Sequence, residues 1–207
     1  MRPDDTLILY RLVGLVTRPV IRVLFRPQLR GLEHLPRDGG FVLSANHLSG
    51  FDAWAVSYAI YPRQPRNMAK NQLFARPLLG PVIRSLGAFP AHGDETLVGG
   101  AAAAAALAAD GNAVVIYPEG ARRRRGEEHR PRTGAARAAL EAGVPLIPVA
   151  LRGTDGWRRL ERWRLAVGPP LALDDLSGAE EQRSARAATS RLWAAIAELG
   201  DALDREG

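Results

Sequence analysis

Apolar and polar stretches alternate along this chain in a way that predicts alternating strands and helices. Short, almost wholly apolar runs at residues 113–117 and 144–151 are typical of parallel strands buried on both faces. Shorter or interrupted strands are expected at residues 41–43, 67–69, 88–90 and 164–173. Helices are expected at residues 53–60, 78–86, 96–109, 134–142 and 179–203. This order predicts an α/β fold, a single sandwich domain with a largely parallel sheet flanked by helices.

Apolar residues also dominate positions 6–25, but arginines interrupt them at spacings of 7, 4 and 4. Arg11, Arg18, Arg22 and Arg26 therefore share one stripe of a helix whose other side is broadly apolar. Each arginine costs up to about 2.5–3.5 kcal/mol in a bilayer core, which cancels the gain from the apolar residues. We therefore expect residues 1–27 to form an amphipathic helix in the membrane interface, with its arginines toward lipid phosphates. The alternative is a helix that packs on the body of its own protein.

We expect residues 28–207 to form the remaining domain. The composition of the whole chain limits the functions that this domain can have. The net charge of +6 favours an anionic partner such as phosphate, a membrane surface or nucleic acid. The chain has no cysteine, which excludes disulfides, cysteine nucleophiles and thiolate metal sites. Its four histidines do not follow a zinc-ligand spacing, so no metal is expected. Lys70 is the only lysine among 28 basic residues, which singles it out for attention.

The first candidate for chemistry is the stretch in which Asp52 follows His47 by five residues. Ser49 and Gly50, between them, favour a tight turn after the strand at 41–43 and before the next helix. In such a turn the carboxylate can reach the imidazole, fix its tautomer and make His47 a general base. The alternative is that Asp52 only caps the helix and that His47 is an incidental loop residue.

The second candidate stretch runs from Tyr117 to Arg122 and also leaves an apolar strand. The C-terminal ends of parallel strands share one edge of a sheet, and ligands bind at that edge in open α/β folds. Glu119 supplies a carboxylate, and Gly120 lets a ligand approach the backbone closely. Arg122 supplies a guanidinium that can bind phosphate with two hydrogen bonds. The arginines at 123–125 fit a solvated loop or a lipid-facing patch better.

Together the two stretches resemble motifs of the lysophospholipid acyltransferase family, in particular the bacterial 1-acyl-glycerol-3-phosphate acyltransferases. His47 and Asp52 match the family's His-x-x-x-x-Asp motif, in which an asparagine often stands where this chain has Asn46. Residues 117–122 resemble its Phe-Pro-Glu-Gly-Thr-Arg motif, with Ala121 in place of threonine. Two such motifs in the right order, each after a strand, are more specific than either alone.

The resemblance extends over residues 31–150 but has one clear departure. Residues 144–149 look like the family's apolar fourth motif, and residues 132–134 fall where members often have Lys-x-Gly. The second motif usually runs Gly-x-Phe-Pro-x-x-Arg, and its arginine position falls here on Gly93, next to His92. Lys70 is a candidate substitute, because family members also carry a phosphate-binding lysine at a similar place.

The resemblance implies direct acyl transfer in phospholipid biosynthesis. His47, oriented by Asp52, would remove the proton of an acceptor hydroxyl that attacks the thioester of acyl-CoA or acyl carrier protein. Four residues would bind the phosphorylated acceptor: Lys70, Glu119, Gly120 and Arg122. The implied acceptor is 1-acyl-glycerol-3-phosphate (lysophosphatidate), which gives phosphatidate, and no cofactor beyond the acyl donor is implied. We expect a peripheral or monotopic protein on the cytoplasmic face of the cell membrane.

Other functions stay open at this point. The acceptor can be a lysolipid without a phosphate, given the missing arginine of the second motif. A peripheral protein that binds anionic lipid without catalysis explains the basic residues, but not the spacing of His47 and Asp52. Nucleic-acid binding lacks interleaved aromatic residues and a recognisable module. Lipid hydrolysis lacks a Gly-x-Ser-x-Gly nucleophile turn.

Overall fold

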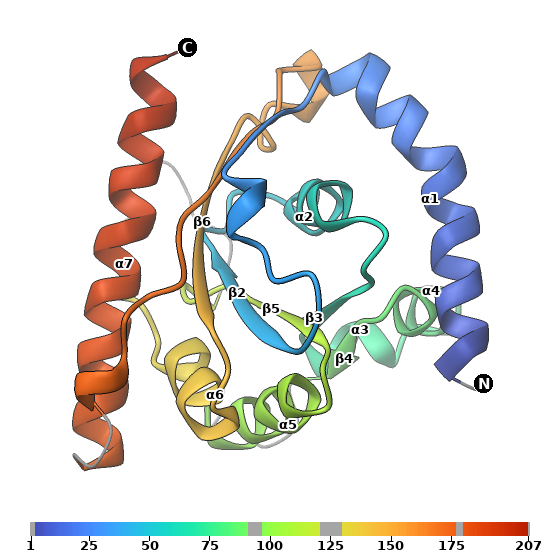
Figure 1. Cartoon of the computed structure of the whole chain (residues 1–207). Helices are drawn as coiled ribbons and strands as arrows, with labels where there is room; N and C mark the ends of the chain where they lie inside the picture. Colours follow the sequence, from blue (N-terminus) through green and yellow to red (C-terminus); the bar gives the residue numbers. More distant parts are fainter. Residues whose placement is uncertain (1–2, 91–96, 121–129, 177–179, 207) are drawn as a thin grey trace.

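A seven-stranded sheet lies at the centre of the computed structural model, in the order β1-β7-β6-β2-β5-β3-β4 (Figure 1). The structure describes residues 3–90, 97–120, 130–176 and 180–206. The strands are β1 (Gln28–Arg30), β2 (Phe41–Ala45), β3 (Pro65–Ala69), β4 (Phe89–Pro90), β5 (Ala113–Ile116), β6 (Leu146–Arg152) and β7 (Arg164–Val167). Neighbouring strands pair in parallel except β6 and β7, which are antiparallel. The predicted α/β fold with a largely parallel sheet is confirmed.

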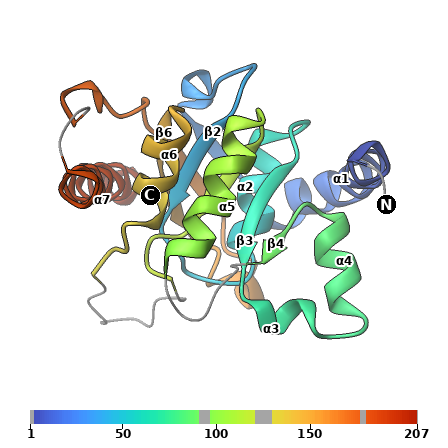
Figure 2. The same ribbon diagram turned by 90° about the horizontal axis from the view of Figure 1, so that it is seen from below.

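Helices cover both faces of this sheet. They are α1 (Pro3–Phe25), α2 (Asp52–Ile60), α3 (Asn71–Phe74), α4 (Leu79–Ser85), α5 (Leu97–Ala109), α6 (Gly134–Ala142) and α7 (Glu181–Arg205), with 3₁₀ turns η1 (Leu32–His34), η2 (Trp157–Arg159) and η3 (Asp174–Leu176). In two views α7 and α1 lie on opposite sides of the molecule, and α5 and α6 lie between them (Figures 1 and 2). Alternate residues of each central strand pack toward α1 and α2 or toward α5, α6 and α7.

The predicted helices and strands agree with the observed ones to within a few residues, and the differences have local causes. The strand expected at 164–173 ends at Val167, because prolines follow at 169 and 170 and cannot donate to a ladder. The helix expected at 134–142 is observed with those bounds and ends at Gly143, whose φ of 62° is the left-handed conformation of a C-cap. The sequence analysis missed β1 and α3, which have only three and four residues.

The inner face of α1 is part of the protein core. Ile21 and Phe25 belong to the same buried cluster as β2 and α2, and the ring of Phe25 stacks on Trp163 with centroids 4.2 Å apart. Arg18 also points inward, where it donates a 2.7 Å hydrogen bond to the carbonyl of Tyr58. The predicted stripe of outward arginines is therefore wrong at Arg18, whose guanidinium also lies over two tyrosine rings.

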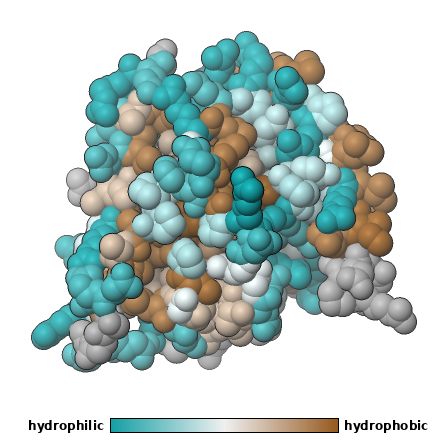
Figure 3. Space-filling view, viewed as in Figure 1, coloured by the Kyte–Doolittle hydropathy of each residue, from teal (hydrophilic) through white to brown (hydrophobic). Residues whose placement is uncertain are grey.

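The outer face of α1 is apolar and exposed. Among the large apolar side chains described on α1, five are more than half exposed: Ile8, Leu12, Leu15, Val16 and Val23. Hydrophobic residues gather on the side of the molecule where α1 lies (Figure 3). Within the described ranges, no helix combines the length and apolarity needed to cross a membrane. The helix thus packs on its own body with one face and leaves an apolar face uncovered.

We expect Phe25→Ala to lower the free energy of unfolding by about 3–5 kcal/mol, because it removes a buried aromatic ring and leaves a cavity. Val23→Ala is the matched control, since Val23 lies two residues away and is 74% exposed. That variant should stay within about 0.5 kcal/mol of the wild type. Denaturant unfolding of both variants measures the difference, and equal costs would contradict the packing of α1 on the core.

Candidate active site

Three neighbouring parallel strands bring most of the predicted site residues to one edge of the sheet. The registers of β2, β5 and β3 align Leu43, Val115 and Asn67 side by side. The chain leaves this edge toward His47 after β2, toward Glu119 after β5 and toward Lys70 after β3. The parallel topology therefore places residues far apart in the sequence at one edge of the sheet, where ligands bind in such folds.

His47 and Asp52 form a hydrogen-bonded pair in the turn after β2. Imidazole Nδ1 lies 2.7 Å from Oδ2 of Asp52, and the same oxygen accepts the backbone N–H groups of Leu48 at 2.7 Å and Ser49 at 2.8 Å. The Asp52 side chain is fully buried, whereas the imidazole is 22% exposed. An acceptor at Nδ1 holds the ring proton there and leaves the lone pair on Nε2 for a substrate.

The geometry does not fit the alternative in which Asp52 only caps a helix. Asp52 is the first residue of α2, and the N-cap position belongs to Phe51, which makes no side-chain capping hydrogen bond. Both backbone groups that Asp52 binds precede it in the chain, in the turn that carries His47. The carboxylate therefore shapes this turn and orients its imidazole.

Thr154, two residues beyond β6, completes the surroundings of Asp52. Its hydroxyl donates to Oδ1, and its backbone carbonyl accepts a 2.9 Å hydrogen bond from the hydroxyl of Ser49. Nearby, the Asn46 side chain exchanges two hydrogen bonds with the backbone of Leu151. Sequence analysis did not find Thr154, because 102 residues separate it from Asp52 and no motif marks it.

Tyr117 and Glu119 hold His47 from the neighbouring strand. The Tyr117 ring stacks on the imidazole with centroids 4.2 Å apart and planes 22° apart. Its hydroxyl is buried without a hydrogen bond in the described structure, and this burial, with the charge of Asp52, raises the pKa of Tyr117 well above its usual value. Glu119 is also buried, and its Oε2 accepts the backbone N–H of His47 at 3.3 Å.

Gly120 is the last residue of a turn that begins at Tyr117. Its N–H donates to the carbonyl of Tyr117 at 3.1 Å, and its φ of 69° is a conformation that favours glycine. A Cβ at this position would collide with the side chain of Arg132. The backbone N–H of Arg132 donates to the carbonyl of Pro118. Glycine here thus permits both the turn and the close approach of a guanidinium.

Lys70 is exposed at the start of α3, directly after β3. Within the described ranges its ammonium forms no recorded hydrogen bond or ion pair, so it is available to an anion. Arg122 lies outside the described residues, as do His92 and Gly93 of the second motif. In the described part of the chain, no three His, Cys, Asp or Glu side chains lie close enough together to hold a metal ion.

The part of the chain that forms this edge of the sheet matches a known protein family. The model of the family described as Acyltransferase matches residues 26–152, which is more than half of the chain and includes both candidate stretches. The chain belongs to the Acyltransferase family. His47, Asp52 and Glu119 thus lie within the part of the chain that matches the family, whereas Thr154 lies just beyond it.

Known proteins agree with this assignment at the level of fold. A crystal structure of the 1-acyl-sn-glycerophosphate (LPA) acyltransferase PlsC from Thermotoga maritima superposes with a TM-score of 0.71 and 21% sequence identity, covering 96% of this chain and 83% of that one. Uncharacterized proteins of Mycobacterium bovis and Mycobacterium tuberculosis are 28% identical over 154 residues, which is 68% of this chain. The chain spans only 42% of the length of these mycobacterial relatives.

We expect Thr154→Val to destabilise the acyltransferase fold, because valine keeps the shape but cannot donate to the buried carboxylate. Loss of a hydrogen bond to a charged group costs about 1.5–3 kcal/mol. Thr154→Ser keeps the hydroxyl and should recover most of that loss. Denaturant unfolding of the two variants provides the comparison, and a valine variant as stable as the serine variant would contradict this account.

Proposed function

We propose that this protein transfers a fatty acyl group from an acyl thioester to the hydroxyl of a lysophospholipid. The observation that carries the proposal is the bond between imidazole Nδ1 of His47 and the buried carboxylate of Asp52. It occurs in a member of the Acyltransferase family, at the edge of the sheet where ligands bind. A protein that only binds lipid has no use for an imidazole held in this way.

The chemistry follows from the orientation of the imidazole. Nε2 of His47 takes the proton of the acceptor hydroxyl while its oxygen attacks the thioester carbonyl. The tetrahedral intermediate then collapses, the C–S bond breaks, and the imidazolium returns the proton to the departing thiolate of CoA or acyl carrier protein. Asp52 stabilises the imidazolium between these steps. A positioned base of this kind contributes about 10²–10⁴-fold to the rate.

The proposed acceptor is 1-acyl-glycerol-3-phosphate. Its phosphate needs cations and backbone donors, and Lys70, Gly120 and Arg122 are the proposed binding residues. Glu119 is also expected to lie at the acceptor site, and its buried carboxylate accepts the backbone N–H of His47, so we propose that it supports the turn that carries this base. The Thermotoga maritima protein of similar fold is named for the same acceptor, which supports this choice.

The proposed location is the cytoplasmic face of the cell membrane, with the protein bound peripherally. The apolar outer face of α1 supports this, because it is uncovered while the inner face packs on the core. Exposed Arg11 and Arg22 lie beside that face, where they can reach lipid phosphates.

We expect His47→Ala to lower turnover by about 10²–10⁴-fold in protein that is folded at the assay temperature, and to lower the melting temperature as well, because buried Asp52 loses one of its donors. Mass spectrometry of products from an acyl-CoA and a panel of lysolipids measures the transfer. His34→Ala is the control, because His34 binds the backbone of Val167 in a different part of the fold. A His47 variant with near-wild-type turnover would rule out the proposed mechanism.

If Lys70 binds the acceptor phosphate, Lys70→Ala should lower kcat/KM for lysophosphatidate about 10- to 100-fold, which corresponds to one lost charge-assisted contact. The KM for the thioester should not change, because the phosphate positions only the acceptor hydroxyl. Lys70→Arg keeps the charge and serves as the matched variant. Equal effects on lysophosphatidate and on a lysolipid without phosphate would instead favour the alternative acceptor.

A further inference from the structure

Large exposed apolar side chains are confined to one side of the described structure. Those recorded as large and exposed lie on α1, on α2 at Trp54, at residues 78–82 beside and within α4, and at η2 with Leu160. Within the described ranges, α5, α6 and α7 on the opposite side of the sheet carry none. An apolar surface of this extent on a basic protein is typical of contact with a membrane or another protein.

The segment of residues 157–160, which includes η2, has the composition of a membrane-interface anchor. Trp157 is 39% exposed and Leu160 is 43% exposed, and between them stand two exposed arginines, Arg158 and Arg159. The guanidinium of Arg158 lies 5.2 Å from the centre of the Trp157 ring. Tryptophan favours the headgroup level of a bilayer, and arginine favours anionic headgroups.

Aromatic packing fixes this segment against the proposed catalytic turn. The ring of Trp157 lies 5.1 Å from that of Phe51, the residue directly before Asp52. Phe51 in turn packs on Trp163, which stacks on Phe25 at the end of α1. The segment therefore packs directly against the turn that holds His47.

The end of α1 lies directly beside the segment. Arg26 donates a 3.1 Å hydrogen bond to the carbonyl of Leu160. Val23 and Leu24, in the last turn of α1, are exposed apolar neighbours. The segment thus extends the apolar outer face of α1 toward the edge of the sheet where the candidate active site lies.

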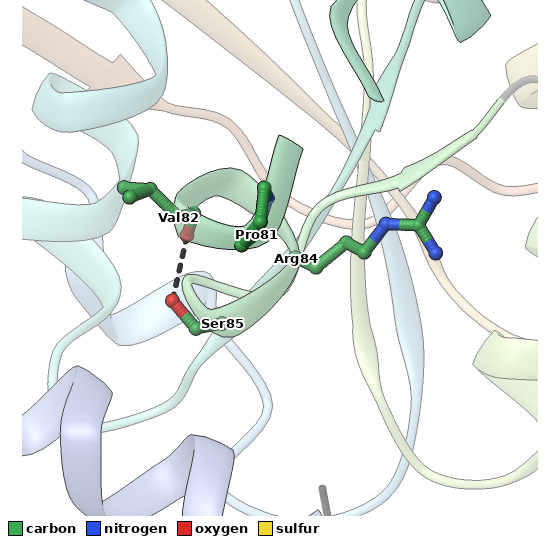
Figure 4. Close-up of a pocket in the computed structure, with 4 residues that line it drawn as sticks. All are labelled: Pro81, Val82, Arg84 and Ser85. Atoms are coloured by element: carbon green, nitrogen blue, oxygen red, sulfur yellow. Dashed lines mark hydrogen bonds between the residues drawn. The ribbon is translucent and has the colours of Figure 1, made fainter. Parts of the chain in front are cut away.

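Residues next to α4 extend the same surface at the other end of α1. Leu78 is 86% exposed and Val82 is 52% exposed, and α4 packs beside α1. A shallow hollow lined by Pro81, Val82, Arg84 and Ser85 lies here (Figure 4). The exposed apolar surface therefore follows α1 from Ile8 to Leu24.

The charges beside this surface favour anionic lipid over a second copy of the chain. Arg22, Arg26, Arg158 and Arg159 are all exposed around the end of α1 and the segment. Glu161 pairs with Arg159 at 2.7 Å, and Asp155 is the other acidic residue nearby. A symmetric pairing of two copies would bring the arginines together, whereas lipid phosphates neutralise them.

We propose that residues 157–160 form a second membrane anchor, which inserts into an anionic phospholipid surface beside α1 and holds the His47 turn there. The proposal rests on the proposed function and identifies the surface through which the lipid acceptor arrives. α1 supplies the broad contact, and the segment sets the distance between the bilayer and the site.

The first test removes charge. Arg158→Gln/Arg159→Gln should weaken binding to vesicles of phosphatidylglycerol and phosphatidylcholine by roughly 30-fold, since each basic residue near an anionic surface contributes about fivefold. Arg183→Gln/Arg186→Gln is the matched control, because it removes the same charge from exposed positions on α7, on the opposite side. Vesicle co-sedimentation should show no change for the control, and equal losses for both pairs would overturn the proposal.

The second test removes the apolar side chain without loss of stability. Leu160 has a φ of 53°, which a leucine seldom adopts, so Leu160→Gly relieves the backbone while it removes the inserted group. We expect several-fold weaker vesicle binding with a melting temperature equal to or above that of the wild type. Wild-type vesicle binding by this variant, or a dimer in sedimentation analysis that the substitution dissociates, would overturn the anchor.

Activity assays separate this proposal from the proposed function. Each anchor variant should lose acyl transfer to lysophosphatidate embedded in vesicles in proportion to binding, and should keep wild-type transfer to a soluble short-chain lysophosphatidate. Loss of transfer to the soluble acceptor would show that the segment acts in catalysis and would overturn the anchor. A wild type that acylates neither acceptor would refute the proposed function, and vesicle binding would still report on the anchor.

Discussion

The buried carboxylate of Asp52 is the constraint on which the site depends. A fully buried charge is costly unless donors surround it, and here they come from two parts of the chain: His47 with the backbone at 48–49, and Thr154. The requirement to satisfy one charge therefore fixes the shape of the turn and joins β2 to the residues after β6. It also orients the imidazole, so stability and the proposed chemistry depend on the same hydrogen bonds.

The central strands and the position of the site were predictable, because they follow from local patterns. A parallel strand covered on both faces must be apolar throughout, so β5 and β6 are visible as uninterrupted apolar runs. Once these strands are placed in parallel, their C-terminal ends share an edge, and the positions of His47, Glu119 and Lys70 follow. The spacing of His47 and Asp52 offered their contact as one of two interpretations, and the structure shows the contact.

Contacts between distant segments were not predictable in this way. The spacing of the α1 arginines predicted exposure correctly for Arg11, Arg22 and Arg26. Nothing near Arg18 in the sequence shows that it lies over the rings of Tyr58 and Tyr61. Thr154 has no motif and acts across 102 residues. The resemblance predicts that Glu119 binds the acceptor, but its burial and its contact with the backbone of His47 are visible only in three dimensions.

The two faces of α1 connect the core to the proposed membrane contact. A helix that is apolar around most of its circumference must be covered on more than one side. Here Ile21 and Phe25 are covered by the core, and the outward side chains from Ile8 to Val23 are not. Because Phe25 stacks on Trp163, which packs on Phe51 beside Asp52, the covered face ends in the aromatic cluster behind the turn that carries His47. A lipid surface against the uncovered face would then lie at a fixed distance from His47. Such a distance is what an acceptor requires if its acyl chain stays in the bilayer while its hydroxyl reaches the imidazole.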